Sequence, residues 1–340
     1  MKSLSKATCV VTGAAGFIAS HLIDRLLSLG HAVIGIDNLS TGSINNIAGH
    51  LTNKSFRFIR ADIRDPQLLT RLNLPADITK ICFNLAAIVS VPYSIEHPEL
   101  TLAINHTAAV SLLNEAESLG FASFVFAGSA AEYGLCQRIP LREQDATGCG
   151  LASPYGLSKY LTTQCVRQSP IGVSMRFFNV YGPRQDPSSP YSGVISKFSD
   201  AAQNRQPFTI FGDGSQTRDF VFVQDIVTGC IKAAGLYKAP RLQGVYNLGT
   251  GSRVTLLELT KTINTITKTQ LPLCFKPERA GDIKHSVADV SLLTHVLDWK
   301  PATPLHLGLT RLLSTVTQEM EPEVLEAVNS PSLAEIKRPQ

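Results

Sequence analysis

Short apolar runs alternate with longer amphipathic segments through the first half of the chain. The apolar runs predict strands at residues 8–12, 32–36, 56–60, 81–84, 123–127 and 173–177. Amphipathic segments predict helices at residues 16–29, 100–119 and 155–167. Because strand–helix alternation is typical of a parallel sheet covered on both faces, the sequence predicts an α/β fold with a Rossmann-type, doubly wound parallel sheet.

The pattern changes near residue 180. A stretch rich in proline and serine at 182–193 predicts a loop, and turn signals follow at 212–214 and 249–251. We expect residues 1–180, with a returning segment at about 219–246, to form the first domain. Residues at about 181–218 and 247–320 would form a smaller α+β domain that binds substrate, and residues 321–340 a loosely held tail.

Composition narrows the function classes. With 340 residues, 44% of them hydrophobic, the chain can bury a large core, and a net charge of +4 predicts neither a nucleic-acid nor a membrane surface. No apolar run reaches the ~18 residues of a membrane helix. The seven cysteines are scattered without a C-x-x-C pair, and the eight histidines lack ligand spacing. We therefore expect a cytoplasmic protein with reduced thiols and no metal.

A glycine-rich turn joins the first predicted strand to the first predicted helix. Gly13 allows the tight turn, and Gly16 lets backbone N–H groups and the helix N-terminus approach a pyrophosphate. The second strand is followed by Asp37, whose carboxylate suits ribose hydroxyls and repels a 2′-phosphate. The turn therefore predicts NAD rather than NADP as cofactor, with a simple turn cap as the alternative interpretation of Asp37.

Tyr155 and Lys159 are spaced i, i+4 at the start of a predicted helix and so share one helical face. An ammonium group near a phenol lowers the phenol pKa from about 10 toward working pH, which would make Tyr155 an acid–base group. The alternative interpretation is a pair of side chains on the helix surface with no catalytic role. The position of the pair after a complete dinucleotide loop favours catalysis.

At this point the chain resembles the extended short-chain dehydrogenases/reductases, and most of all the UDP-hexose 4-epimerases. The resemblance runs from about residue 6 to about residue 301, and its stretches are 12–19, 37–42, 62–63, 84–87, 129–134, 155–159, 176–183, 211–219, 247–251 and 279–282. It implies a UDP-sugar substrate, retained NAD, and a homodimer paired through helices near 100–118 and 155–167.

The resemblance also implies a role for individual residues. The catalytic group would be Ser129, Tyr155 and Lys159. Contacts to NAD, with Tyr155 and Lys159 among them, would come from Gly13, Gly16, Phe17, Ile18, Asp37, Asn38, Ser40, Thr41, Gly42, Asp62, Ile63, Leu85, Ala86 and Ala87. Contacts to the substrate, besides those of Ser129 and Tyr155, would come from Ser90, Asn179, Val194, Phe211, Arg218, Arg279, Asp282 and Ser286.

Within these sets, the resemblance gives several residues a specific partner. Asp62 and Ile63 would meet the adenine. Phe211 would line the uracil pocket, and Asp282 would reach the uridine ribose. The substrate diphosphate would be held by Asn179, Arg218 and Arg279, because arginine forks suit phosphate oxygens.

Two alanines bear on the reaction. The related 4,6-dehydratases carry an Asp-Glu pair where this chain has Ala130 and Ala131, and the related decarboxylases carry a glutamate at the place of Ala131. Glu132 stands one residue late, and we expect it to point away from the sugar. These departures favour simple epimerisation. Gly128, where many relatives carry serine, is a further departure beside Ser129.

The gate position of the family falls on Ser286, seven residues after Arg279. A small residue there admits a 2-acetamido group, and residues 90–94 resemble epimerases that prefer N-acetylhexosamines. The sequence thus favours UDP-GlcNAc/UDP-GalNAc interconversion, with UDP-Glc/UDP-Gal also possible. UDP-glucuronate or another nucleotide sugar is the alternative, and a cofactor-sensing regulator is the non-enzyme alternative.

Overall fold

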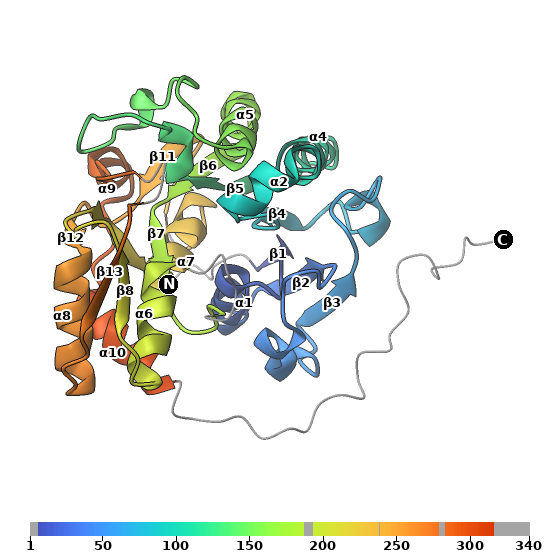
Figure 1. The fold of residues 1–340 in the computed structure, drawn as a ribbon. Coiled ribbons are helices and arrows are strands. Elements are labelled where there is room, and N and C mark those ends of the chain that lie inside the picture. The colour runs from blue at the N-terminus through green and yellow to red at the C-terminus, as the bar shows by residue number, and fades with distance from the viewer. Residues whose placement is uncertain (1–5, 187–192, 238, 279–282, 316–340) are drawn as a thin grey trace.

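A computed structural model describes residues 6–186, 193–237, 239–278 and 283–315 (Figure 1). Seven parallel strands form the main sheet in the order β11-β6-β5-β4-β1-β2-β3. Their bounds are β1 Ala7–Thr12, β2 Ala32–Asp37, β3 Phe56–Arg60, β4 Thr79–Asn84, β5 Ser123–Ser129, β6 Gly172–Phe177 and β11 Gly244–Leu248. The order reverses between β1 and β4, which is the topology of a Rossmann-type fold, as predicted.

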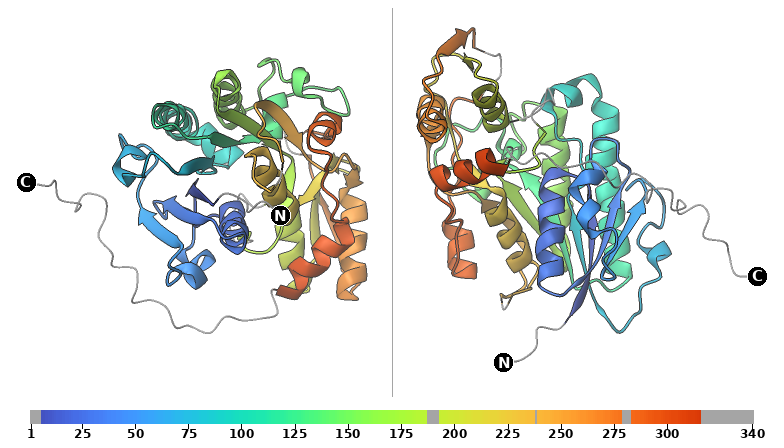
Figure 2. Two further views of the ribbon diagram at one scale, coloured as in Figure 1. Left: turned by 180° about the vertical axis from the view of Figure 1, so that it is seen from behind. Right: turned by 90° about the horizontal axis from the view of Figure 1, so that it is seen from below.

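Helices cover both faces of this sheet (Figures 1 and 2). Helices α1 (Phe17–Ser28) and α7 (Val223–Ala233) pack on one face, and α4 (Ala109–Ser118) and α5 (Pro154–Gln168) on the other. Successive residues of a strand point to opposite faces of the sheet, so Val10 and Val11 of β1 belong to different apolar cores. Both faces of the sheet are therefore buried, which explains the continuous apolar runs in the sequence.

The helix predicted at 100–119 is one α-helical path with a defect. It consists of α3 (Pro98–Leu102), a π-helical turn η4 (Ala103–Ala108) and α4. The side chain of Asn105, inside the π-turn, accepts from Ile88 N and donates to Ile88 O, both at 2.8 Å. The bulge thereby brings a side chain to the loop after β4, and such π-bulges frequently accompany functional sites.

The rest of the chain forms a smaller layer of helices and two-stranded sheets beside the main sheet. Strands β8 and β13 pair in parallel, β7 pairs with β10, and β9 pairs with β12. The bounds are β7 Asn179–Tyr181, α6 Val194–Gln203, β8 Phe208–Phe211, β9 Thr217–Arg218, β10 Phe220–Phe222, β12 Val254–Thr255, α8 Leu256–Thr267, β13 Leu273–Lys276, α9 Ser291–Leu297 and α10 Leu305–Thr315. This layer has its own apolar core, built around Phe198, Phe208, Leu259 and Leu309.

The segment at about 219–246, which we expect to return to the first domain, contributes elements inside and outside the main sheet. Strand β10 pairs with β7 outside the main sheet, whereas α7 packs on α1 and β11 forms the sheet edge. Strand β11 runs to Leu248, past the expected boundary at 246. The tail at 321–340 lies outside the described residues. Across the parts of the chain that the structure describes, no helix is long and apolar enough to span a bilayer.

Short helical turns complete the secondary structure. They are α2 Val91–Glu96, η1 Ile44–Asn46, η2 Ala48–His50, η3 Thr70–Leu72, η5 Ala130–Tyr133 and η6 Glu143–Asp145. Of these, α2 and η5 border the candidate site, because α2 follows β4 and η5 follows β5 directly.

Candidate active site

The carboxyl ends of β1, β2, β4 and β5 meet at one edge of the main sheet, where ligands bind in open α/β folds. The Gly13 loop leaves β1 at this edge. Asp37 ends β2, Asn84 ends β4, and Ser129 ends β5. The fold thus brings the predicted cofactor loop and the predicted catalytic serine to the same edge, although they are over 100 residues apart in the sequence.

The Gly13 loop is closed by close backbone contacts. Gly13 has a φ of +68°, and a Cβ at this position would lie 2.9 Å from the backbone of Ala86. Gly16 caps α1 without any side-chain cap, and its own Cβ would lie 3.0 Å from the carbonyl oxygen of Gly13. The first-turn N–H groups of α1, including those of Phe17 and Ile18, have no partner within the helix and so suit a pyrophosphate.

Asp37 organises the loop from the end of β2. Its Oδ2 accepts from Ala15 N at 3.0 Å and its Oδ1 from Leu39 N at 2.7 Å, so the turn-capping interpretation is realised. Burial raises the pKa of this carboxyl against those two hydrogen bonds. Each carboxylate oxygen has a further lone pair, so capping leaves acceptor capacity for ribose hydroxyls. A Cβ on Gly42 would lie 3.0 Å from Oδ2.

Asn38 and Asp62 join the ends of two neighbouring strands, because Asn38 Nδ2 donates to Asp62 Oδ2 at 2.8 Å. The hydrogen bonds from Arg64 hold the pKa of Asp62 at about 2, so this group stays anionic. Sequence reasoning missed Arg64. Among the other predicted cofactor residues, Ile63 is buried, Ser40 and Thr41 are exposed, and three residues after β4 are half-buried, namely Leu85, Ala86 and Ala87.

The residues present fit a bound dinucleotide. Besides the glycine cradle, the Asn84 amide nitrogen is a buried donor with no partner among the described residues. The other end of that amide accepts from Thr12 Oγ1 at 2.7 Å, and Thr12 Oγ1 accepts from Ala86 N at 3.2 Å. The loops after β1 and β4 are therefore locked together around the place where the cofactor would pass.

Ser129, Tyr155 and Lys159 lie near one another in the structure. The Ser129 hydroxyl interacts with the Tyr155 phenol and opposes the effect of burial on its pKa, and Lys159 Nζ lies 6.0 Å from the Tyr155 ring centroid. Ser153 caps α5, because its Oγ accepts from Gly156 N at 3.1 Å, and this fixes where the helix and its tyrosine begin. Ser94 holds the same turn, since its Oγ accepts from Tyr155 N at 3.2 Å.

The expectation that Lys159 lowers the phenol pKa of Tyr155 is wrong. Lys159 Nζ donates to Ala127 O at 2.8 Å and lies 6.0 Å from the ring centroid of Tyr155. Burial raises the pKa of Tyr155, with the Ser129 hydrogen bond acting in the opposite direction. Burial lowers the pKa of Lys159 to about 8. Desolvation outweighs the attraction on which the prediction was based.

The predicted substrate residues lie on the smaller layer and its borders. Arg218 Nη1 donates to Thr217 O at 3.0 Å, and buried Ser286 donates its backbone N–H to the same oxygen at 3.1 Å. Phe211 ends β8, and its carbonyl accepts from Gln216 Nε2 at 2.6 Å. The gate position, the phosphate-binding candidate and the uracil candidate are thus linked through residues 216–218.

Asp219 accepts hydrogen bonds from several loops, a structural role that the sequence did not predict. Its buried carboxylate accepts from Thr250 N and Oγ1, Gly251 N and Ala288 N, and its carbonyl accepts from Asn179 N. It therefore ties Asn179 to two loops of the smaller layer. The only signal in the sequence was its place directly after Arg218.

Other predicted substrate residues have local roles or fall outside the description. Ser90 Oγ accepts from Tyr93 N at 3.0 Å and so caps α2. Val194 is the first residue of α6 and is half-buried. Arg279 and Asp282 lie outside the described residues. No group of His, Cys, Asp and Glu suited to a metal occurs in the described ranges.

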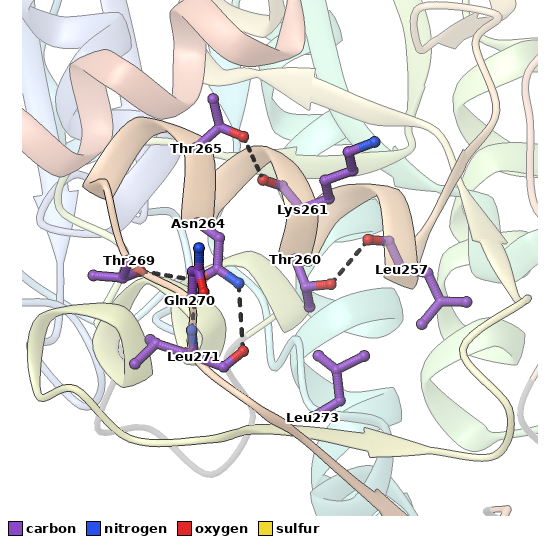
Figure 3. Close-up of a pocket in the computed structure, with 9 residues that line it drawn as sticks. All are labelled: Leu257, Thr260, Lys261, Asn264, Thr265, Thr269, Gln270, Leu271 and Leu273. Atoms are coloured by element: carbon purple, nitrogen blue, oxygen red, sulfur yellow. Dashed lines mark hydrogen bonds between the residues drawn. The ribbon is translucent and has the colours of Figure 1, made fainter.

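A surface hollow lies between α8 and β13, lined by residues between 257 and 273 (Figure 3). Its polar groups bond to one another: Asn264 Oδ1 accepts from Thr269 Oγ1 at 2.8 Å and from Leu271 N at 3.1 Å. None of the predicted catalytic, cofactor or substrate residues lines it. The chemistry is therefore assigned to the sheet edge and not to this hollow.

Comparison with known proteins agrees with this geometry. Residues 9–249 match the NAD-dependent epimerase/dehydratase family. The UDP-glucose 4-epimerase of Mycolicibacterium smegmatis is 35% identical over 317 residues, covering 89% of this chain and 96% of the relative. UDP-glucuronic acid decarboxylase 2 of Arabidopsis thaliana is 31% identical, over 92% of this chain and 68% of the relative.

A solved structure extends the comparison to the fold. The UDP-N-acetylglucosamine 4-epimerase from Methanobrevibacter ruminantium, in complex with UDP-N-acetylmuramic acid, is 32% identical with a TM-score of 0.82. The match covers 93% of this chain and 100% of that chain. These proteins share a fold and a family, and differ in sugar and reaction.

Proposed function

Because this chain belongs to the NAD-dependent epimerase/dehydratase family, and NAD is the cofactor of that family, we propose that it catalyses the 4-epimerisation of a UDP-sugar. The observation that carries the proposal is the placement of Ser129, at the end of β5, beside Tyr155 and buried Lys159 at the cofactor edge of the sheet. Epimerisation needs only this trio from the protein. The neighbouring Ala130 and Ala131 carry no group that could move a proton at carbons 5 or 6 of the sugar.

In the proposed reaction, Tyr155 as phenolate removes the proton of the sugar 4-hydroxyl while Ser129 hydrogen-bonds the same oxygen. Lys159, held by its hydrogen bond to Ala127 O, would bind the ribose next to the nicotinamide. NAD, when bound, supplies the acceptor for the C4 hydride and afterwards its donor. The 4-keto sugar turns over while Asn179 and Arg218 keep the diphosphate in place, and Tyr155 then returns the proton to the new hydroxyl.

For the sugar, we favour UDP-GlcNAc/UDP-GalNAc, with UDP-Glc/UDP-Gal as second substrates. Ser286 supports this choice, because it is a small, buried side chain at the gate position and leaves room for a 2-acetamido group. The similarity to a UDP-N-acetylglucosamine 4-epimerase supports it as well. UDP-glucuronate is disfavoured by Pro92 and Tyr93, which offer no arginine to a carboxylate. The intact Tyr155–Lys159 pair disfavours a cofactor-sensing regulator.

The domain roles and the assembly belong to the same proposal. Residues of the main sheet would bind NAD and the smaller layer the UDP-sugar. The homodimer would pair through α4 and α5, and the protein would act in the cytoplasm. A sedimentation measurement that gives the monomer mass at micromolar concentration would contradict the dimer without affecting the chemistry.

The substrate assignment is tested by NMR on separate incubations with UDP-GlcNAc, UDP-Glc and UDP-glucuronate. We expect UDP-GalNAc to form from UDP-GlcNAc at the highest kcat/KM, with UDP-Gal from UDP-Glc more slowly. Faster conversion of UDP-glucuronate would contradict the sugar assignment. Loss of CO2 from UDP-glucuronate would contradict epimerisation as the reaction.

A further inference from the structure

Gly128 and Glu132 flank Ser129 in the sequence, and the space that a side chain at 128 would need is taken by the Glu132 carboxylate. A Cβ on Gly128 would lie 2.8 Å from Glu132 Oε1 and 2.7 Å from Ser174 Oγ, closer than real Cβ contacts. Both oxygens are buried and hydrogen-bonded, so neither can move aside cheaply. Glycine at 128 therefore leaves the room that the carboxylate of Glu132 occupies.

The Glu132 carboxylate contacts the backbone of Ser129, and both of its oxygens accept hydrogen bonds. Its Oε1 accepts from Ser129 N at 2.9 Å and from Thr163 Oγ1 at 3.0 Å, and its Oε2 accepts from Arg176 Nε at 2.6 Å. Glu132 is 1% exposed and Arg176 2%. Burial raises the pKa of Glu132, while Arg176 and the hydrogen bonds act against that effect. Because all three partners donate, the arrangement fits an ionised carboxylate held in a buried ion pair.

This carboxylate and the serine also brace each other. Ser129 Oγ accepts from Ala131 N at 3.1 Å, while the Glu132 side chain receives the Ser129 N–H, which together make a capping box at the start of η5. The backbone of Ser129, and with it the hydroxyl that meets Tyr155, is thus held by Glu132 and through it by Arg176 of β6.

We propose that Glu132 is a positioning residue for the epimerisation: its carboxylate, accommodated by Gly128, holds the backbone of Ser129 and with it the hydroxyl that faces Tyr155. The inference rests on the proposed function and deepens it. Glu132 acts through its neighbours, since its carboxylate is committed to three donors inside the protein.

The charges around this carboxylate come from every element packed on it. They are Tyr155 and Lys159 from α5 and Arg176 from β6, while Tyr133 from η5 and Glu143 from η6 face Arg176. Burial and, after it, Glu132 raise the pKa of Tyr155. For Lys159 burial lowers the pKa and Glu132 opposes that effect. Removing the charge at 132 should therefore lower the pKa values of both groups.

The test is the pH dependence of kcat and KM for the NAD-loaded wild type and Glu132→Gln. We expect both limbs of the kcat profile to move to lower pH by about one to three units, because unit charges about 4 Å apart interact by about 4 kcal/mol at an effective dielectric constant of about 20, and one pKa unit corresponds to about 1.4 kcal/mol. We also expect kcat to fall at least about tenfold with little change in KM, because Ser129 touches the reacting oxygen rather than the nucleotide.

Glu143→Gln is the matched control. It removes a half-buried carboxylate from the same polar network, one whose Oε1 accepts from Asn247 N and not from Ser129. The limbs of the kcat–pH profile of Glu143→Gln should stay at the same pH values as in the wild type. A shift equal to that of Glu132→Gln would overturn the specific role of Glu132.

Glu132→Gln leaves Arg176 buried without its partner and can unfold the protein. The double variant Glu132→Gln/Arg176→Gln removes both charges, and its limbs should still move to lower pH, but by less than in Glu132→Gln, because the loss of the Arg176 cation acts in the opposite direction. Unshifted limbs in both variants, with only a lower Tm, would make Glu132 a purely structural group and overturn the proposal.

The role of Glu132 can still be tested if the protein does not epimerise UDP-sugars. A wild type that converts no UDP-sugar contradicts that function alone. The ultraviolet titration of tyrosinate, with the Tyr155→Phe signal subtracted, then compares the pKa of Tyr155 in the wild type and Glu132→Gln without turnover. A lower value in the variant supports the inference, and equal values overturn it.

Discussion

Lys159 Nζ donates a hydrogen bond to the carbonyl of Ala127 at 2.8 Å, so the lysine is fixed to the end of β5 and not to Tyr155. The contact is buried, with Lys159 3% exposed, and burial lowers its pKa to about 8. The hydrogen bond to this neutral acceptor and the charge of Glu132 do not offset the cost of burying the ammonium. The lysine therefore disfavours folding while it is protonated, and this has a measurable consequence.

In cofactor-free protein, the contribution of Lys159 to stability should rise with pH. The unfolded lysine binds its proton up to its ordinary pKa, and the folded lysine only up to about 8. Stability is therefore lost as pH falls from about 10.5 to 8, by roughly 3 kcal/mol in total. Urea unfolding at pH 8, 9 and 10 should show this slope in the wild type and not in Lys159→Met. Equal slopes would contradict the lowered pKa.

Gly13→Ala should abolish NAD retention. The substitution places a Cβ 2.9 Å from the backbone of Ala86 at a φ of +68°, so the loop must move from the pyrophosphate position. Gly120→Ala is the matched control, because Gly120 has the same φ and nothing within 4 Å of its Cβ. Both variants should lose about 1–2 kcal/mol. Only Gly13→Ala should lack NAD in the acid-released cofactor assay, and NAD at wild-type occupancy there would refute the assignment.

Asp219→Asn should weaken substrate binding as well as stability. An amide offers one oxygen to four donors, so at least one buried donor faces an NH2 group, which costs roughly 2–4 kcal/mol. The loops at Thr250 and Ala288 should loosen, and KM for the UDP-sugar should rise more than kcat falls. Asp213→Asn, an exposed aspartate of the same layer, should change neither Tm nor KM. A normal KM in Asp219→Asn would count against its bracing role.

Ser286→Tyr should change sugar selectivity. Ser286 is buried beside Thr217, so a phenol there fills space that a 2-acetamido group would need. We expect kcat/KM for UDP-GlcNAc to fall at least about 100-fold while that for UDP-Glc falls less than tenfold, since steric exclusion acts on one substrate only. Ser252→Tyr, on an exposed loop, controls for the added phenol. Equal losses for both sugars would refute the gate.

The sequence predicted the fold, because the strands and helices of the main sheet rest on local patterns of apolar and polar residues. Strand β3 was located to the residue, since both of its ends are marked by polarity. The π-turn at Asn105 was missed, because a one-residue bulge leaves the helical periodicity nearly unchanged. Its signal is a long-range contact with Ile88, which no periodicity contains.

The protonation of the site could not be predicted from spacing. An i, i+4 pair places Tyr155 and Lys159 on one face, but desolvation depends on what covers that face. The role of Glu132 depended on Gly128 and on Arg176, which lies 44 residues away and reaches it only through β5–β6 pairing. Such partners are fixed by the sheet and not by any local motif.

The central claim is tested most directly by NMR on wild type and Tyr155→Phe, each incubated with UDP-GlcNAc without added NAD. The account predicts UDP-GalNAc from the wild type and a loss of at least about 10³-fold in Tyr155→Phe, with an unchanged Tm and the same content of bound NAD. Equal rates for the two proteins would contradict Tyr155 as the acid–base group. No conversion of any UDP-sugar by wild type with bound NAD would contradict 4-epimerisation itself.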